Sequence, residues 1–180
     1  MSGKSFSLKH FPSAGIQLNF KITGNVKRDP NTLSISYSLV GAMAEIVIPP
    51  PADMPSRKNN LWEETCFECF LGLINSERYW EFNLSPAGHW NVYSFKAYRK
   101  GMQEEPAFTS LPFCVERKPD ALLLSLKFDL DKIIPADQAL KVGAGAVIKP
   151  TNGKASYWAL THPAPQPDFH QKNSFIVELR

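Results

Sequence analysis

The 180-residue chain has few of the features that mark several large classes of protein. Its three cysteines are too few for the disulfide framework of a small secreted domain. It has no run of five or more basic residues and its formal net charge is +3, so we expect no nucleic-acid partner. No apolar run is long enough to cross a bilayer, and the first residues, MSGKSFSLKHF, lack the apolar segment of a secretory signal. We therefore expect a cytoplasmic protein with no membrane partner.

Helical periodicity is also scarce, and residues 129–134 (DLDKII) form the one segment that we expect to make a helical turn. The chain consists instead of short segments in which apolar and polar residues alternate, a pattern typical of β-strands. We expect strands at 16–23, 33–40, 44–48, 65–73, 79–85, 89–94, 111–116, 121–128, 141–149, 156–160 and 174–179, with a turn at 24–31.

This pattern predicts an all-β protein with one domain. The expected architecture is an antiparallel β-sandwich of about ten strands, similar to an immunoglobulin or jelly-roll fold. The sandwich would span residues 16–180, and residues 1–15 would form an N-terminal extension or an edge segment.

Residues 61–102 organise the rest of the predicted sheet. They contain three successive strands, and the turn Ser85-Pro86-Ala87-Gly88 suits a tight hairpin between the second and the third. The hairpin would pair Ser85 with His89, Asn83 with Asn91, and Glu81 with Tyr93. Apolar residues then face mostly apolar residues, and polar residues face polar ones. A shift of one residue would move every side chain to the opposite face, so this agreement supports the register.

One face of these strands carries acids, amides and rings together. Its members are Glu68, Glu81, Asn83, Asn91 and Tyr93, followed by Arg99. This face could be the solvated outside of a sandwich, because antiparallel sheets often expose one polar side. It has little lysine, however, and its side chains suit a polar or polyhydroxylated ligand in a cleft. We therefore interpret it as the wall of a binding site, beside which Trp62 would either offer a stacking surface or fill the core.

Cys66 and Cys69 have the C-x-x-C spacing of redox and zinc sites. Inside a strand, however, the two thiols would point to opposite faces of the sheet. The chain has no second cysteine pair, so we interpret both residues as small buried hydrophobic side chains.

A second cluster of polar groups lies within residues 157–170 (YWALTHPAPQPDFH), a loop that three prolines stiffen. His162, Asp168 and His170 could ligate zinc or iron, since imidazole and carboxylate groups suit both metals. They could instead hold the loop in place through hydrogen bonds to its backbone, or face the wall around Glu68 as part of a ligand site. Three ligands on one irregular loop do not by themselves define a metal site, so we expect no metal.

The motifs LWEETCFECFL…YWEFNLSPAGHWNVYSFKAYRKGM and SYWALTHPAPQPDFH resemble the DOMON-like ligand-binding superfamily. Within it, the chain is similar to small bacterial proteins that resemble family 9 carbohydrate-binding modules, over about residues 16–179. The resemblance implies a β-sandwich that binds a ligand rather than catalysing a reaction, with sugars or haem as the ligands of better-studied relatives. Haem-binding relatives use methionine and histidine as axial ligands, and no methionine here has an evident histidine partner, which argues against haem.

Sugar-binding relatives hold the ligand between two tryptophans, which implies Trp62 and Trp158 here, with Glu68, Asn83 and Arg99 as polar partners. The full set of expected ligand-binding residues is Trp62, Glu68, Glu81, Asn83, Tyr93, Arg99, Trp158, His162, Asp168 and His170.

The leading hypothesis is a module that binds a sugar or another small polar ligand on a sheet face. One alternative is a hydrolytic enzyme, in which Glu68 and Glu81 form a carboxylate pair about 5 to 10 Å apart. A metal-dependent enzyme built on His162, Asp168 and His170 is a variant of that alternative. The last alternative is an interaction module that docks a protein through an exposed apolar face.

Overall fold

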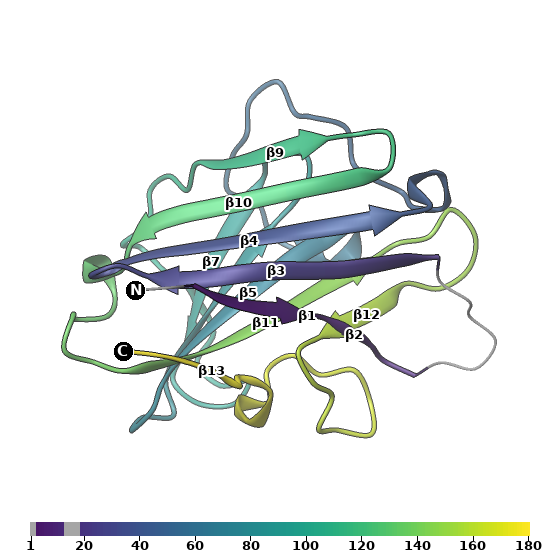
Figure 1. Cartoon of the computed structure of the whole chain (residues 1–180). Helices are drawn as coiled ribbons and strands as arrows, with labels where there is room; N and C mark the ends of the chain where they lie inside the picture. Colours follow the sequence, from purple (N-terminus) through teal and green to yellow (C-terminus); the bar gives the residue numbers. More distant parts are fainter. Residues whose placement is uncertain (1–2, 13–18) are drawn as a thin grey trace.

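Two antiparallel β-sheets packed face to face make up the computed structural model, which describes residues 3–12 and 19–180 (Figure 1). The smaller sheet has the strand order β1 (Lys4–Ser7), β3 (Phe20–Arg28), β4 (Thr32–Gly41), β10 (Ala121–Asp129) and β9 (Phe113–Arg117). The larger sheet has the order β2 (Lys9–His10), β12 (Ser156–Ala159), β11 (Leu140–Ile148), β5 (Cys66–Leu73), β6 (Tyr79–Leu84), β7 (Trp90–Phe95) and β8 (Gln103–Glu104), and β13 (Val177–Leu179) also pairs with β11. The predicted all-β antiparallel sandwich is confirmed.

The described residues form thirteen strands, where the sequence indicated about ten. The strands missed by the alternation pattern are β1, β2 and β8, which have only two to four residues each. So short a segment cannot show a period of two. β1 pairs with β3 and β2 pairs with β12, so residues 4–10 lie at one edge of each sheet. None of the helices in the described part of the chain is long and apolar enough to cross a membrane.

The predicted hairpin has the expected register. β6 and β7 pair with Asn83 opposite Asn91 and Glu81 opposite Tyr93. Gly88 closes the turn at a φ of +95°, in the left-handed region that glycine adopts without strain.

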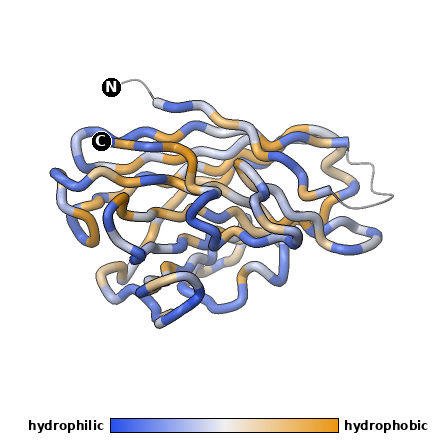
Figure 2. The backbone as a smooth tube through the Cα atoms, turned by 90° about the horizontal axis from the view of Figure 1, so that it is seen from below, coloured by the Kyte–Doolittle hydropathy of each residue, from blue (hydrophilic) through white to orange (hydrophobic). Residues whose placement is uncertain are grey.

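The main core fills the space between the two sheets. On β4 the inward side chains Leu33, Ile35, Tyr37 and Leu39 are at most 1% exposed, as the strict alternation in the sequence predicted. The Tyr37 hydroxyl donates a hydrogen bond across the core to the backbone oxygen of Glu68, at 2.7 Å, and so links the two sheets. In Figure 2 hydrophobic segments lie mainly in the interior and hydrophilic segments mainly at the periphery.

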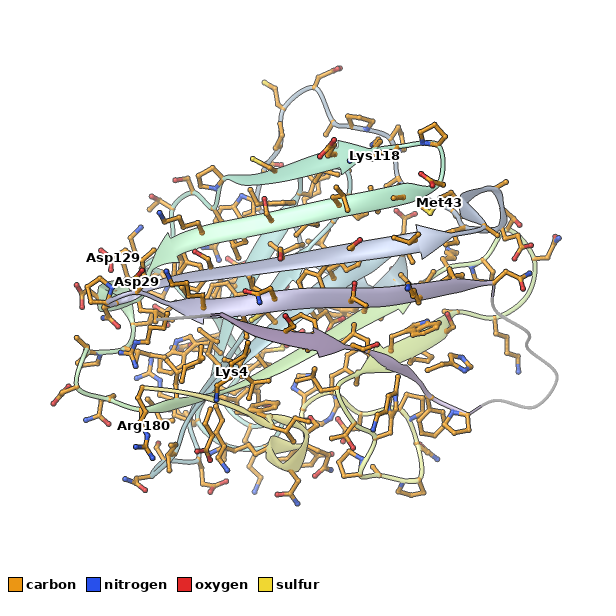
Figure 3. The ribbon with its side chains drawn as sticks, viewed as in Figure 1. Lys4, Asp29, Met43, Lys118, Asp129 and Arg180 are labelled. Atoms are coloured by element: carbon orange, nitrogen blue, oxygen red, sulfur yellow. The ribbon has the colours of Figure 1, made fainter. Side chains whose placement is uncertain are left out.

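The prediction of a strand at 44–48 is wrong. Met43–Glu45 form a short 3-10 helix, η1, and only Ile46 makes an isolated bridge, to Pro150. The prolines that follow, at 49–51, lack the N–H groups that a strand ladder requires, so a strand cannot continue here. In Figure 3, Met43 lies near Lys118 at one end of the smaller sheet, opposite the end that carries Asp29 and Asp129.

Three other element ends differ from the prediction. The turn expected at 24–31 begins later, because β3 continues to Arg28. The strand expected at 16–23 begins at Phe20, and its positions 16–18 lie outside the described residues. The strand expected at 174–179 is preceded by a 3-10 turn, η4 (Lys172–Ser174), and begins at Val177. The helical turn expected at 129–134 is confirmed as η3 (Leu130–Lys132).

Part of the outer face of the larger sheet is covered by protein. A second hydrophobic cluster there includes Phe70, Tyr79 and Phe95 from the sheet, and Phe169 and Phe175 from the chain after β12.

The glycines of β11 explain how that cover fits so closely. A Cβ at Gly143 would lie 2.5 Å from the Phe175 ring, and one at Gly145 would lie 3.0 Å from the Phe169 ring. The glycines in the sequence KVGAGAVIK therefore leave room for the covering aromatic side chains, rather than forming a phosphate loop.

Candidate ligand-binding site

A cavity of about 360 Å³ opens on this covered outer face. Five neighbouring strands each contribute one residue to its floor, namely Glu68 of β5, Glu81 of β6, Phe95 of β7, Val147 of β11 and Tyr157 of β12. The pairing explains this convergence, since Glu68 lies opposite Asn83, two residues from Glu81, and Val147 lies opposite Tyr157. Residues two apart on a strand, and residues opposite each other on paired strands, share one face of the sheet.

Loops supply the walls of the cavity. They are Trp62 in the 3-10 helix η2 (Leu61–Glu63), Arg99 and Met102 between β7 and β8, and Pro167, Phe169 and His170 after β12. The Trp62 ring meets the Tyr93 ring edge to face, with 6.0 Å between centroids. The Tyr93 hydroxyl donates to Oδ1 of Asn59 at 2.6 Å, which holds the loop before Trp62 against the sheet.

A hydrogen-bonded network fixes the two loops that carry Arg99 and His170. The backbone N–H of Arg99, a residue at a φ of +51°, donates to the Tyr79 hydroxyl at 3.1 Å. That hydroxyl is 2.9 Å from Nδ1 of His170. The Arg99 guanidinium donates to Asp168 at 2.9 Å, and Asp168 also accepts from the Tyr98 hydroxyl and from the backbone N–H of His170. Burial opposes ionisation of Asp168, but the hydrogen bonds from Tyr98 and Arg99 outweigh it and lower the pKa of this carboxyl.

The two glutamates at the floor are in an environment that disfavours their charge. Glu68 and Glu81 are each 3% exposed. Burial raises the pKa of Glu81 to about 7, against partial opposition from the Asn83 hydrogen bond and from Arg99. Burial and the neighbouring charge of Glu81 raise the pKa of Glu68 well above its ordinary value.

The imidazole beside them does not supply a counter-ion. Burial, and then the charge of Arg99, lower the pKa of His170 to about 4, so its ring is neutral at neutral pH. Since the hydroxyl of Tyr79 accepts from Arg99 and is free to donate to Nδ1, the geometry fits a ring whose proton is on Nε2. Nε2 lies 3.8 Å from Oε2 of Glu81.

The structure brings most of the expected site residues together. Trp62, Glu68, Glu81, Arg99 and His170 line the cavity. Three more of the expected residues contact residues that line the cavity. Asp168 pairs with Arg99, Asn83 donates to Oε1 of Glu81 at 2.9 Å, and Tyr93 packs against Trp62.

Trp158 and His162 lie elsewhere. Trp158 is 6% exposed and belongs to the core between the sheets, where its ring centroid is 5.0 Å from that of Phe20. Its neighbour Tyr157, which points the opposite way, is the residue at the cavity. Nε2 of His162 lies 2.8 Å from the backbone oxygen of Lys9. Within 3–12 and 19–180, no three His, Cys, Asp or Glu side chains are grouped so that they could hold a metal ion.

Sequence reasoning missed several residues that line the cavity. Phe95 could have been found, because it lies two residues after Tyr93 and therefore on the same face. Val147 and Tyr157 required knowledge of which face of β11 and β12 points outward, and alternation alone does not give it. Phe169 and Met102 lie on loops, whose paths no periodicity in the sequence specifies.

Comparison with known proteins gives structural matches only. No protein-family model and no curated protein matches the chain. Its structure is similar to the crystal structure of a proposed carbohydrate-binding protein from Bacteroides uniformis, with a TM-score of 0.69 and 10% identity over 96% of this chain and 84% of that one. It is also similar to a family 9 carbohydrate-binding module from Caldicellulosiruptor kristjanssonii in complex with cellotriose, with a TM-score of 0.52 and 9% identity over 91% and 75% of the two chains.

Proposed function

Since the chain has the fold of family 9 carbohydrate-binding modules, we propose that it binds a small carbohydrate in the cavity on the larger sheet. The observation that carries this proposal is the meeting of ring faces and buried polar groups in one cavity. Trp62 and Tyr157 offer rings on which the C–H face of a sugar can stack. Glu68, Glu81 and Arg99 offer acceptors and donors to its hydroxyl groups.

The size of the cavity favours a short ligand. Its volume of about 360 Å³ is near the lower end of the range for small-molecule sites. A monosaccharide or a disaccharide suits such a volume better than the middle of a long polysaccharide chain.

Isothermal titration of the protein with glucose, galactose, mannose and cellobiose tests the proposal. Trp62→Ala should weaken binding about fivefold, because losing a stacked ring costs on the order of 1 kcal/mol. Trp158→Phe is the matched control, because Trp158 lies in the core and should affect stability but not affinity. Absence of binding by every sugar, or equal affinity of wild type and Trp62→Ala, would contradict the proposal.

A hydrolytic enzyme is the second candidate, and one observation favours it. Glu68 and Glu81 face the same cavity from adjacent strands, and the pKa of Glu81 is raised to about 7, near the value that suits a general acid. Release of nitrophenol from a panel of nitrophenyl glycosides would reveal such activity. Glu68→Gln and Glu81→Gln should each abolish it, and turnover that survives in both variants would rule out these carboxylates as the catalytic pair.

A further inference from the structure

Glu68 is a buried carboxylate at the floor of the cavity. It is 3% exposed and lines the cavity, yet none of the described residues donates a hydrogen bond to its side chain or pairs with it. Glu105, another buried acid, is 6% exposed and, unlike Glu68, has several partners. That carboxylate accepts hydrogen bonds from Nε1 of Trp80 at 3.0 Å and from the backbone N–H of Ala107 at 3.2 Å, and it lies 3.7 Å from Arg78.

Hydrogen-bond donors on the same face of the sheet as Glu68 donate to other acceptors. The Asn83 amide, directly opposite Glu68 in the sheet, donates to Glu81. The Tyr93 hydroxyl donates to Asn59, and the Cys66 thiol is directed at a backbone oxygen and at Asn83. These donors are therefore engaged elsewhere, and the cavity is the open side from which a ligand can reach Glu68.

The charges around the cavity indicate what kind of partner fits. Arg99 is the one Arg or Lys side chain among the described residues that line it, and Asp168 already pairs with Arg99 at 2.9 Å. His170 faces Glu81 as a neutral ring. Arg99 attracts both carboxylates at the floor but forms its ion pair with Asp168 rather than with either of them. A buried acid without an ion-pair partner is destabilising unless a proton or a cation neutralises it.

We propose that the cavity takes a ligand with an ammonium group, and that this group sits at the floor against Glu68 and Glu81. An amino sugar combines such a group with the stacking face that Trp62 and Tyr157 accept, so this inference rests on the proposed carbohydrate function. Aromatic residues around an ammonium group add to its binding, because a cation is attracted to a ring face. Phe95 and Phe169 line the same cavity as the two carboxylates.

Titration with glucosamine, N-acetylglucosamine and glucose at neutral pH tests this inference. Glucosamine should bind at least about tenfold more tightly than the two neutral sugars, as expected when a charged group is paired in a buried site. Glu68→Gln should remove this preference, so that glucosamine and glucose bind the variant with similar affinities. Glu104→Gln, which alters an exposed acid on β8, is the matched control and should keep the preference. A thermal melt of each variant verifies that it is folded.

The outcomes separate this inference from the proposed function. Equal affinity for glucosamine and glucose, or a preference that survives in Glu68→Gln, overturns the ammonium site and leaves carbohydrate binding standing. If methylammonium binds and no sugar competes with it, and if its binding is lost in Glu68→Gln, the ammonium site is supported and the carbohydrate function is overturned. If neither the sugars nor methylammonium bind, both proposals fail.

Discussion

Replacing Glu81 by glutamine should stabilise the free protein, and the gain should depend on pH. The pKa of Glu81 is about 7 in the folded protein, against an ordinary value of 4.5. Below 4.5 the carboxyl is protonated in both states and does not affect stability. As the pH rises from 4.5 to about 7, the unfolded chain loses this proton while the folded protein keeps it, so stability falls.

The size of the effect follows from this difference in pKa. It corresponds to about 3 kcal/mol of lost stability once the pH exceeds about 7. Glutamine has the same shape, carries no charge, and can still accept the hydrogen bond that Asn83 donates to Oε1 of Glu81. Glu81→Gln should therefore raise the melting temperature at about pH 8 by roughly 6 to 12 °C, as expected for a chain of this size.

Urea unfolding of wild type and Glu81→Gln at about pH 4.5, 6 and 8 measures the change. The two proteins should be similar in stability at the lowest pH and differ most at the highest. Glu116→Gln, in an exposed position on β9, controls for the general effect of removing a negative charge and should show no such pH dependence. A constant difference at all pH values, or no gain at the highest, would refute the electrostatic description of Glu81.

Two further predictions concern packing and thiol chemistry. Gly143→Ala would place a Cβ 2.5 Å from the Phe175 ring, and this overpacking should cost about 1 to 3 kcal/mol in urea unfolding; an unchanged midpoint would contradict the close fit. In the native protein a thiol reagent should modify only Cys114, which is exposed, because burial raises the pKa of Cys66 and Cys69. All three thiols should react in urea, and rapid native modification of more than one would contradict the predicted burial.

The centre of the site could be predicted from the sequence because the information there is local. A turn of known type, Ser85-Pro86-Ala87-Gly88, joins two arms whose apolar and polar residues alternate in step, so the register of β6 and β7 follows. That register places Glu81 on the same face as Tyr93, and strand β5 adds Glu68 through the same alternation.

The rest of the site depends on contacts between distant parts of the chain. In Ser156–Ala159 both Tyr157 and Trp158 are aromatic, so the sequence does not indicate which of them points into the core. Pairing of Tyr157 with Val147, which lines the cavity, decides the matter. The cover formed by Phe169 likewise depends on Gly145 in another strand.

Stability and binding should oppose each other at the floor of this cavity. A chain selected for stability alone would replace a buried carboxylate that lacks a partner, since apolar residues of similar volume are often neutral or stabilising in such places. Glu68 and Glu81 lie beside a cavity, where a ligand can supply a hydrogen-bond donor or a positive charge. If that is their role, Glu68→Gln and Glu81→Gln must stabilise the free protein at neutral pH and weaken the complex with glucosamine. A variant that gains stability and keeps its affinity for glucosamine would show that the replaced carboxylate does not bind the ligand.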